Sequence, residues 1–202
     1  MIDKLCDYVI KKIKEKVEDM NEEKEVVIDF GVRLLIGEIP KIILLIIIGF
    51  LLGIGWYTVV MFFLLAPYRS STGGFHLKTH TGCMVTTIVL YLLPIILAKI
   101  VTITNDIVFY SLVGAIAMMS IVFITKYVPA DTENIPILSK KDRKAKKIRA
   151  YIWLVILLTI ILFIPDHIIS YMFIYGIFLQ NLTLTPIAYK LTNNKYGYEV
   201  YS

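Results

Sequence analysis

The chain has 202 residues, of which 57% are hydrophobic and only 18% are charged, and its mean hydropathy is +0.73. Soluble domains contain less apolar sequence than this. Several apolar runs approach or exceed the roughly 20 residues that an α-helix needs to cross a bilayer. These properties exclude an ordinary soluble domain. They predict an all-α, polytopic membrane protein with about six transmembrane helices and an amphipathic N-terminal interfacial helix.

Charge and cysteine content narrow the classes of function. The net charge of +5 comes largely from segments between the apolar runs, so it indicates membrane topology rather than nucleic-acid binding. Two cysteines, Cys6 and Cys83, are too few for a disulfide framework. We expect no cleavable signal peptide, because the first thirty residues contain no apolar h-region. No nucleotide-binding or paired-cysteine motif occurs, and we expect no cofactor.

The N-terminal residues 1–25 have apolar side chains at the three-or-four spacing of a helix, with lysines on much of the other side. This pattern is typical of a helix lying in the membrane interface, and equally of one packed on the protein's own cytoplasmic side. We expect a single membrane domain over residues 26–190 and a cytoplasmic tail over residues 191–202.

Six apolar segments are expected to cross the membrane. They are residues 26–52, 56–67, 83–101, 107–127, 151–164 and 167–189. The second is short, and we expect it to continue as an irregular or re-entrant segment through Gly74. The strongly basic loop before residue 150 is cytoplasmic under the positive-inside rule, which places both termini and residues 69–78 inside. The turns at 53–55, 102–106 and 165–167 then face outward.

A polar stretch at residues 66–87 interrupts the apolar sequence and is the expected functional site. Cys83 begins a long apolar run, which predicts a helix N-terminus, where a thiolate is stabilised. His76 lies seven residues upstream, either two helical turns away on the same face or across a bend at Gly82. A thiol beside an imidazole is the nucleophile and base of a cysteine peptidase.

Other residues of the same stretch have expected supporting roles. Gly73 and Gly74 are candidates for an oxyanion hole or for loop support, since their backbone N–H groups can approach a substrate closely. Arg69 and Lys78 add positive potential and are candidate substrate-binding residues. Simpler explanations remain, because a cysteine in a membrane helix is often a packing residue and Gly-Gly is often a turn. His76, His80 and Cys83 also have the spacing of three metal ligands on one helical face, although no fourth ligand is nearby and we expect no metal.

The pattern R-x3-GG-x-H-x6-C, formed by Arg69, Gly73, Gly74, His76 and Cys83, resembles the accessory gene regulator protein B (AgrB) family. The segment VPADTENIP at residues 128–136 is similar to the family motif APxDTxNxP, with Val128 in place of the alanine. The length, the amphipathic N-terminus and the basic loop also agree with this family. The resemblance therefore covers essentially the whole chain.

This resemblance implies a membrane-embedded cysteine endopeptidase of peptide quorum sensing in the bacterial cell membrane. Such an enzyme removes the C-terminal tail of a short AgrD-like propeptide through a thioester on Cys83, with His76 as the base. The propeptide's own cysteine or serine then closes a thiolactone or lactone ring. The resemblance also implies a homodimer.

Three questions stay open at the level of sequence. Asp131, Glu133 or Glu38 would orient His76 only if the chain brings one of them close to it. The basic cluster at residues 140–149 suits an acidic propeptide segment or anionic membrane lipid. A non-enzymatic membrane carrier that binds or exports a peptide is the alternative function, and it predicts that Cys83 is dispensable.

Overall fold

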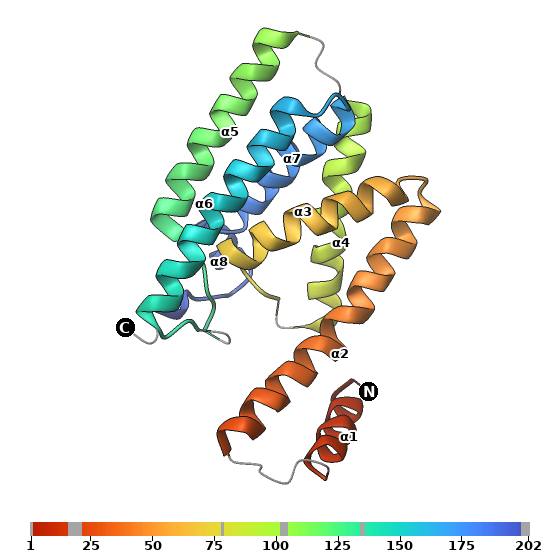
Figure 1. The fold of residues 1–202 in the computed structure, drawn as a ribbon, viewed down its shortest axis with the longest axis vertical. Helices are drawn as coiled ribbons and strands as arrows, with labels where there is room; N and C mark the ends of the chain where they lie inside the picture. The colour runs from red at the N-terminus through yellow and green to blue at the C-terminus, as the bar shows by residue number, and fades with distance from the viewer. Residues whose placement is uncertain (1, 16–21, 78, 102–104, 134–135, 199–202) are drawn as a thin grey trace. The chain divides into compact units, whose positions relative to one another are not determined.

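A computed structural model describes residues 2–15, 22–77, 79–101, 105–133 and 136–198. Within these ranges the protein is all-helical, with eight helices and no strands, as the composition predicts (Figure 1). The helices are α1 (Ile2–Lys14), α2 (Glu22–Leu51), α3 (Gly55–Thr72), α4 (His80–Ile100), α5 (Asp106–Tyr127), α6 (Lys140–Phe163), α7 (His167–Leu182) and α8 (Pro186–Leu191).

Contacts divide the chain into two compact units, Met1–Ile48 and Gly49–Ser202. The first unit contains α1 and most of α2. On α1, Cys6 and Ile10 are buried one helical turn apart whereas Tyr8 is exposed, which agrees with the predicted amphipathic helix. On α2, Lys41 Nζ lies 2.6 Å from Glu38 Oε1, so the carboxylate of Glu38 is paired within its own unit. The expected divisions near residues 25 and 190 stay predictions.

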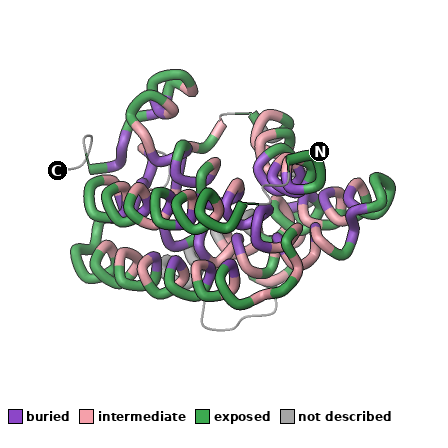
Figure 2. Tube along the Cα trace, turned by 90° about the horizontal axis from the view of Figure 1, so that it is seen from above, coloured by how far each residue is buried: buried purple, intermediate pink, exposed green. Residues whose placement is uncertain are grey.

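The second unit is built around α7, which packs against α3, α4, α5 and α6. Most of α7 is buried, including Phe173 and Ile177, whereas the tube in Figure 2 alternates buried and exposed turns along several of the other helices. Helices that pack on one side only have this alternation. The central position of α7 explains why its sequence is apolar on nearly all faces.

Polar side chains near the C-terminal end of α7 form a buried hydrogen-bonded network. Tyr68 of α3 donates its hydroxyl to Asn181 Oδ1 at 2.9 Å, and Asn181 Nδ2 donates to Ser120 Oγ of α5 at 2.7 Å. All three residues are almost fully buried. Since a buried polar group is costly without partners, this network fixes how α3, α5 and α7 meet at this end of the unit.

In the part of the chain that the structure describes, two helices are long and apolar enough to cross a membrane, Thr81–Ile100 and Asp106–Tyr127. Only 33% and 22% of their apolar windows are buried, which distinguishes them from the core helices of a soluble protein and suits contact with lipid. In the described ranges the other helices are shorter or carry charged turns. Helix α7, for example, has 16 residues and is about 24 Å long. The number of six crossings therefore stays a prediction.

Several predicted boundaries are wrong in ways that capping residues explain. Helix α3 continues to Thr72, so the expected irregular segment begins only at Gly73. Helix α6 starts at Lys140, because the side chain of Ser139 accepts the N–H of Asp142 and begins the helix inside the basic cluster. The last predicted crossing runs to residue 189, but α7 ends at Leu182. A separate helix, α8, follows because Thr185 caps it and Pro186 is its first residue.

Candidate functional site

Helix α3 ends at a glycine pair whose backbone requires glycine. Gly73 has φ +79° and Gly74 has φ +138°, values that L side chains rarely adopt. A Cβ on Gly73 would collide with the carbonyl of Ala130, and one on Gly74 would lie 2.6 Å from Thr183 Oγ1. The glycine pair therefore lets the backbone that follows α3 lie directly against two segments distant in the sequence, one at Ala130 and one at Thr183.

The first of these segments is residues 128–132, which we call the VPADT strap. Ala130 N–H donates to Thr72 O at 2.9 Å, and Gly74 N–H donates to Ala130 O at 2.9 Å, which forms a short parallel bridge. Tyr189 of α8 donates its hydroxyl to the same Ala130 carbonyl at 2.9 Å. The glycine-pair motif and the VPADT strap, which are far apart in the sequence, are thus joined by backbone hydrogen bonds.

The N–H groups of the predicted oxyanion hole take part in this joint. Gly73 N–H donates to Arg69 O at 2.8 Å, and Gly74 N–H donates to Ala130 O. Both donors point at protein carbonyls, so the geometry matches the loop-support role of the glycine pair. An oxyanion role would require one of these bonds to open when substrate binds, and it stays a prediction.

Arg69 connects α3 to α7. Its Nη1 donates to Gln180 Oε1 at 2.7 Å, and Gln180 Nε2 donates to Thr72 Oγ1 at 2.9 Å and to Gly73 O at 2.8 Å. Gln180 is fully buried and Arg69 is half-buried, so this charge-assisted bond is partly shielded from solvent. Arg69 therefore holds the end of α3 in place. Its predicted contact with substrate stays a prediction, and Lys78 lies outside the described residues.

Asp131 of the VPADT strap is fixed by Arg143 of α6 rather than by a histidine. Its Oδ2 lies 2.8 Å from Arg143 Nη1 and accepts the N–H of Ile137 at 2.9 Å, while its buried Oδ1 has no hydrogen-bond partner. Asp131 accordingly does not orient His76 in this structure. For Glu133 and Glu38 the role stays a prediction: the backbone N–H of Glu133 donates to Lys195 O at 3.2 Å, and Glu38 belongs to the first unit.

Part of the basic cluster at residues 140–149 serves internal contacts. Arg143 pairs with Asp131, Lys147 Nζ donates to Thr125 O at 2.6 Å, and Lys146 Nζ donates to Ser70 O at 3.5 Å. Burial, and secondly the nearby Arg149, lower the pKa of Lys146. These three cations therefore position α6 against its neighbours. Lys140, Lys141 and Lys144 lie exposed on the same helix, where lipid or an acidic peptide has access.

Cys83 lies in the first turn of α4. The side chain of Thr79, the N-cap residue, accepts the N–H of Gly82 at 3.1 Å, and the Thr79 carbonyl accepts the N–H of Cys83 at 3.0 Å. This confirms that Cys83 stands at a helix N-terminus. The N-terminus of a helix is the positive end of its dipole.

His76 lies on the linker that leads from α3 into α4, and its side chain is exposed. Because α4 begins only at His80, a continuous two-turn helix carrying both His76 and Cys83 is wrong. The chain bends instead, and it does so at Thr79 rather than at the predicted Gly82, since Thr79 provides the cap. Direct pairing of His76 with Cys83 stays a prediction.

The alternative of a metal site requires His76, His80 and Cys83 on one face of a single helix, and the structure has no such helix, because α4 begins at His80. His76 is not on α4, so the predicted i, i+4, i+7 ligand set does not exist as one helical stripe. Among the described residues, no group of three or more His, Cys, Asp or Glu side chains is placed to hold a metal ion. The side chain of His80 lies outside the described part.

With this geometry established, comparison with known proteins identifies the family. The model of the family described as accessory gene regulator B matches residues 3–184. The chain belongs to the accessory gene regulator B family. A putative AgrB-like protein of Clostridium acetobutylicum is 24% identical over 97% of this chain and 91% of its own length. The accessory gene regulator protein B of Staphylococcus intermedius is 33% identical over 69% of this chain and 71% of its own length.

A putative AgrB-like protein of Listeria monocytogenes is 25% identical over 98% of this chain and 94% of its own length. No solved structure matches the chain. The AgrB family belongs to the accessory gene regulator system of quorum sensing. Together with the two lipid-suited helices, family membership indicates that this protein is associated with a membrane.

Several residues that build this candidate site were not expected from the sequence. Gln180, Asn181 and Thr183 lie at the end of α7 and contact the end of α3 or the linker after it. Tyr189 contacts the VPADT strap. The one available signal was the polar pair Gln180-Asn181 inside an apolar run, because polar side chains at such depth need partners. Nothing in the sequence indicated which partners they have.

Proposed function

We propose that this chain is a membrane-embedded cysteine endopeptidase that removes the C-terminal tail of a short AgrD-like propeptide. Cys83 is the nucleophile and His76 the base. The observation that carries the proposal is the capped start of α4, which holds Cys83 at a helix N-terminus directly after the linker that bears His76. Membership of the AgrB family supports the peptide substrate.

In the first step, His76 accepts the thiol proton of Cys83, and the thiolate attacks the carbonyl of the scissile peptide bond. The carbon–nitrogen bond breaks, the departing amine of the tail takes the proton from imidazolium, and the propeptide is left as a thioester on Cys83.

In the second step, a thiol or hydroxyl of the propeptide attacks the thioester and closes a thiolactone or lactone ring, which returns Cys83 as a thiol. Exchange of one thioester for another is nearly balanced in free energy, so release of the tail draws the reaction forward. The intramolecular nucleophile competes with water because its effective concentration is high. A site in the membrane interface further limits hydrolysis.

The proposal includes a multi-pass arrangement in the bacterial cell membrane, with about six crossings and with both termini and the site on the cytoplasmic side. The exposed lysines of the cluster at residues 140–149 would meet anionic lipid or an acidic part of the propeptide. A homodimer is carried forward from the family resemblance.

The test uses purified full-length protein in liposomes with the propeptide encoded beside its gene. Intact-mass spectrometry is expected to detect an acyl adduct on Cys83 and loss of the tail. Cys83→Ala and His76→Ala are expected to abolish tail removal while still inserting. Cys6→Ala is the matched control, because it removes the other cysteine and should process normally. Normal processing by Cys83→Ala would instead favour a peptide carrier.

A further inference from the structure

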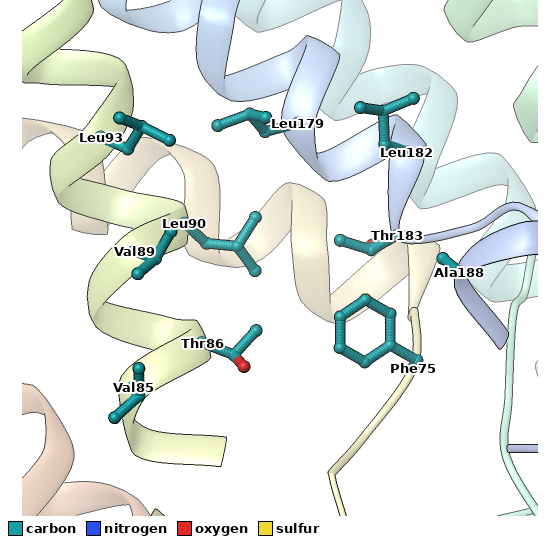
Figure 3. A pocket seen from close by; sticks show the side chains of 10 residues that line it. All are labelled: Phe75, Val85, Thr86, Val89, Leu90, Leu93, Leu179, Leu182, Thr183 and Ala188. Carbon is teal, nitrogen blue, oxygen red and sulfur yellow. The ribbon is translucent and has the colours of Figure 1, made fainter. Parts of the chain in front are cut away.

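An apolar pocket of about 310 Å³ lies between α4 and α7. Figure 3 shows its walls: five side chains from α4, three from the end of α7, Phe75 from the linker and Ala188 from α8. They are Phe75, Val85, Thr86, Val89, Leu90, Leu93, Leu179, Leu182, Thr183 and Ala188. Only two of these residues are polar, and the hydroxyl of Thr183 is used, since it donates to Gln180 O at 2.7 Å.

The walls of this pocket include Phe75, the residue before His76, and Thr86, which is three residues beyond Cys83 on α4. Phe75 is the direct neighbour of His76, and its N–H donates to Thr183 O at 3.4 Å, which ties the linker to the pocket wall. On α4, Leu90 is seven residues beyond Cys83 and thus lies close to the same helical face. Thr86 is about 4.5 Å farther along the helix axis than Cys83. The pocket therefore continues the stripe of α4 that begins with Cys83.

We infer that this pocket receives the side chain of the residue whose carbonyl is transferred to Cys83, and that it selects a large apolar side chain there. This inference rests on the proposed function. An acyl group on the Cys83 sulfur carries its side chain two bonds from the thioester carbon, within reach of a pocket that starts one turn along the helix. The position of the pocket about one helical turn beyond Cys83, with Phe75 in its wall, favours this occupant over a lipid chain.

The volume of the pocket and the chemistry of its walls agree with a large apolar side chain as the occupant. A cavity of roughly 150 Å³ is enough to bind benzene, so a pocket of about 310 Å³ has room for any single natural side chain. Its walls are aliphatic or aromatic, and burying an apolar side chain in them is favourable. A charged side chain would lose its hydration without gaining a partner. Val85, Val89 and Leu182 are exposed at the rim, which leaves an entrance.

The inference can be tested without the natural propeptide. The probes are the phenyl thioesters of N-acetylphenylalanine and N-acetylalanine. The thiolate of Cys83 attacks the thioester carbonyl, the bond to thiophenolate breaks, and thiophenolate leaves with the proton that Cys83 lost. Intact-mass spectrometry of the full-length protein in liposomes follows acylation of Cys83. Rates are divided by those of N-acetylcysteine with the same thioesters, which removes intrinsic reactivity.

The wild-type protein is expected to react about tenfold faster with the phenylalanine thioester than with the alanine thioester, because the aromatic ring is buried. Ala188→Phe fills the pocket, and the ratio is expected to fall to about one. Ile187→Phe is the matched control, since it introduces the same side chain at the exposed neighbouring position and should keep the ratio near ten.

A second variant covers the case in which Ala188→Phe does not fold. Leu182→Ala removes apolar surface at the exposed rim and should lower the ratio about threefold. A wild-type ratio near one, or an unchanged ratio in both Ala188→Phe and Leu182→Ala, would overturn the pocket assignment while leaving Cys83 as the nucleophile. If neither thioester acylates Cys83, the nucleophile itself is contradicted, and the pocket assignment with it.

Discussion

Thr79 determines where Cys83 stands on α4. Its side chain and its carbonyl accept the backbone N–H groups of Gly82 and Cys83, so one residue both starts the helix and fixes the first turn. Gly82 accommodates this cap closely, because a Cβ there would lie 2.7 Å from Thr79 Oγ1. The reactivity proposed for Cys83 therefore depends on a residue that takes no part in the chemistry.

Replacing this cap should change acylation of Cys83 more than it changes the fold. Thr79→Ala removes the side-chain acceptor and should cost about 1 kcal/mol of stability at the start of α4. Because the first turn then frays, acylation of Cys83 by the phenyl thioesters should slow several-fold. Thr79→Ser keeps an acceptor oxygen and should retain the wild-type rate. Equal rates in Thr79→Ala and Thr79→Ser would contradict a role for the cap in positioning the thiol.

At the scale of elements, the site depends on segments that are not neighbours in sequence. The end of α3 is held from one side by Gln180 of α7 and from the other by Ala130 of the VPADT strap. The strap is in turn held by Arg143 of α6 through Asp131. The linker with His76 therefore leaves from a joint to which α3, α6, α7 and α8 contribute, and its starting point is fixed.

Breaking the Asp131–Arg143 pair should loosen this joint. The carboxylate side chain is 1% exposed and Arg143 is 25% exposed, so Arg143→Ala leaves a buried charge and should cost about 3 kcal/mol. Asp131→Asn combined with Arg143→Ala should cost less than the sum of the two single changes, because neither charge is then left unpaired. Thermal unfolding in detergent micelles provides the measurement.

Lys141→Ala is the control for this comparison of the single and double variants. Lys141 is exposed on the same helix, so its loss should change the unfolding free energy by less than about 0.5 kcal/mol. Strictly additive costs for Asp131→Asn and Arg143→Ala would mean that the two side chains do not stabilise the joint as a pair.

On the scale of the whole molecule, lipid is the expected surroundings of α4 and α5. Other parts of the protein cover only 33% and 22% of their apolar segments. Burial of the remaining apolar surface in a bilayer supplies the stabilisation that a soluble core would otherwise provide. The shorter α7 is instead covered largely by other helices, as its buried residues show. A bundle with a protein-covered centre and lipid-facing outer helices is consistent with both observations.

The proposed orientation can be measured by labelling single cysteines. In a Cys6→Ser, Cys83→Ser background, Asn105→Cys at the start of α5 should react with a membrane-impermeant maleimide on intact cells. Lys141→Cys, in the basic cluster, should react only after permeabilisation. Both positions are exposed, so access to the thiol is matched. The opposite pattern would invert the topology and place the site outside the cell.

The sequence by itself determined the helical class and the position of Cys83 at a helix start, because these follow from the local pattern of apolar residues. Only the tertiary structure decided that the two motifs join at Gly74 and Ala130, that Arg69 binds Gln180, that Asp131 pairs with Arg143, and that an apolar pocket lies between α4 and α7. Such contacts between distant residues depend on how helices pack, and several arrangements of the same helices satisfy the same local pattern.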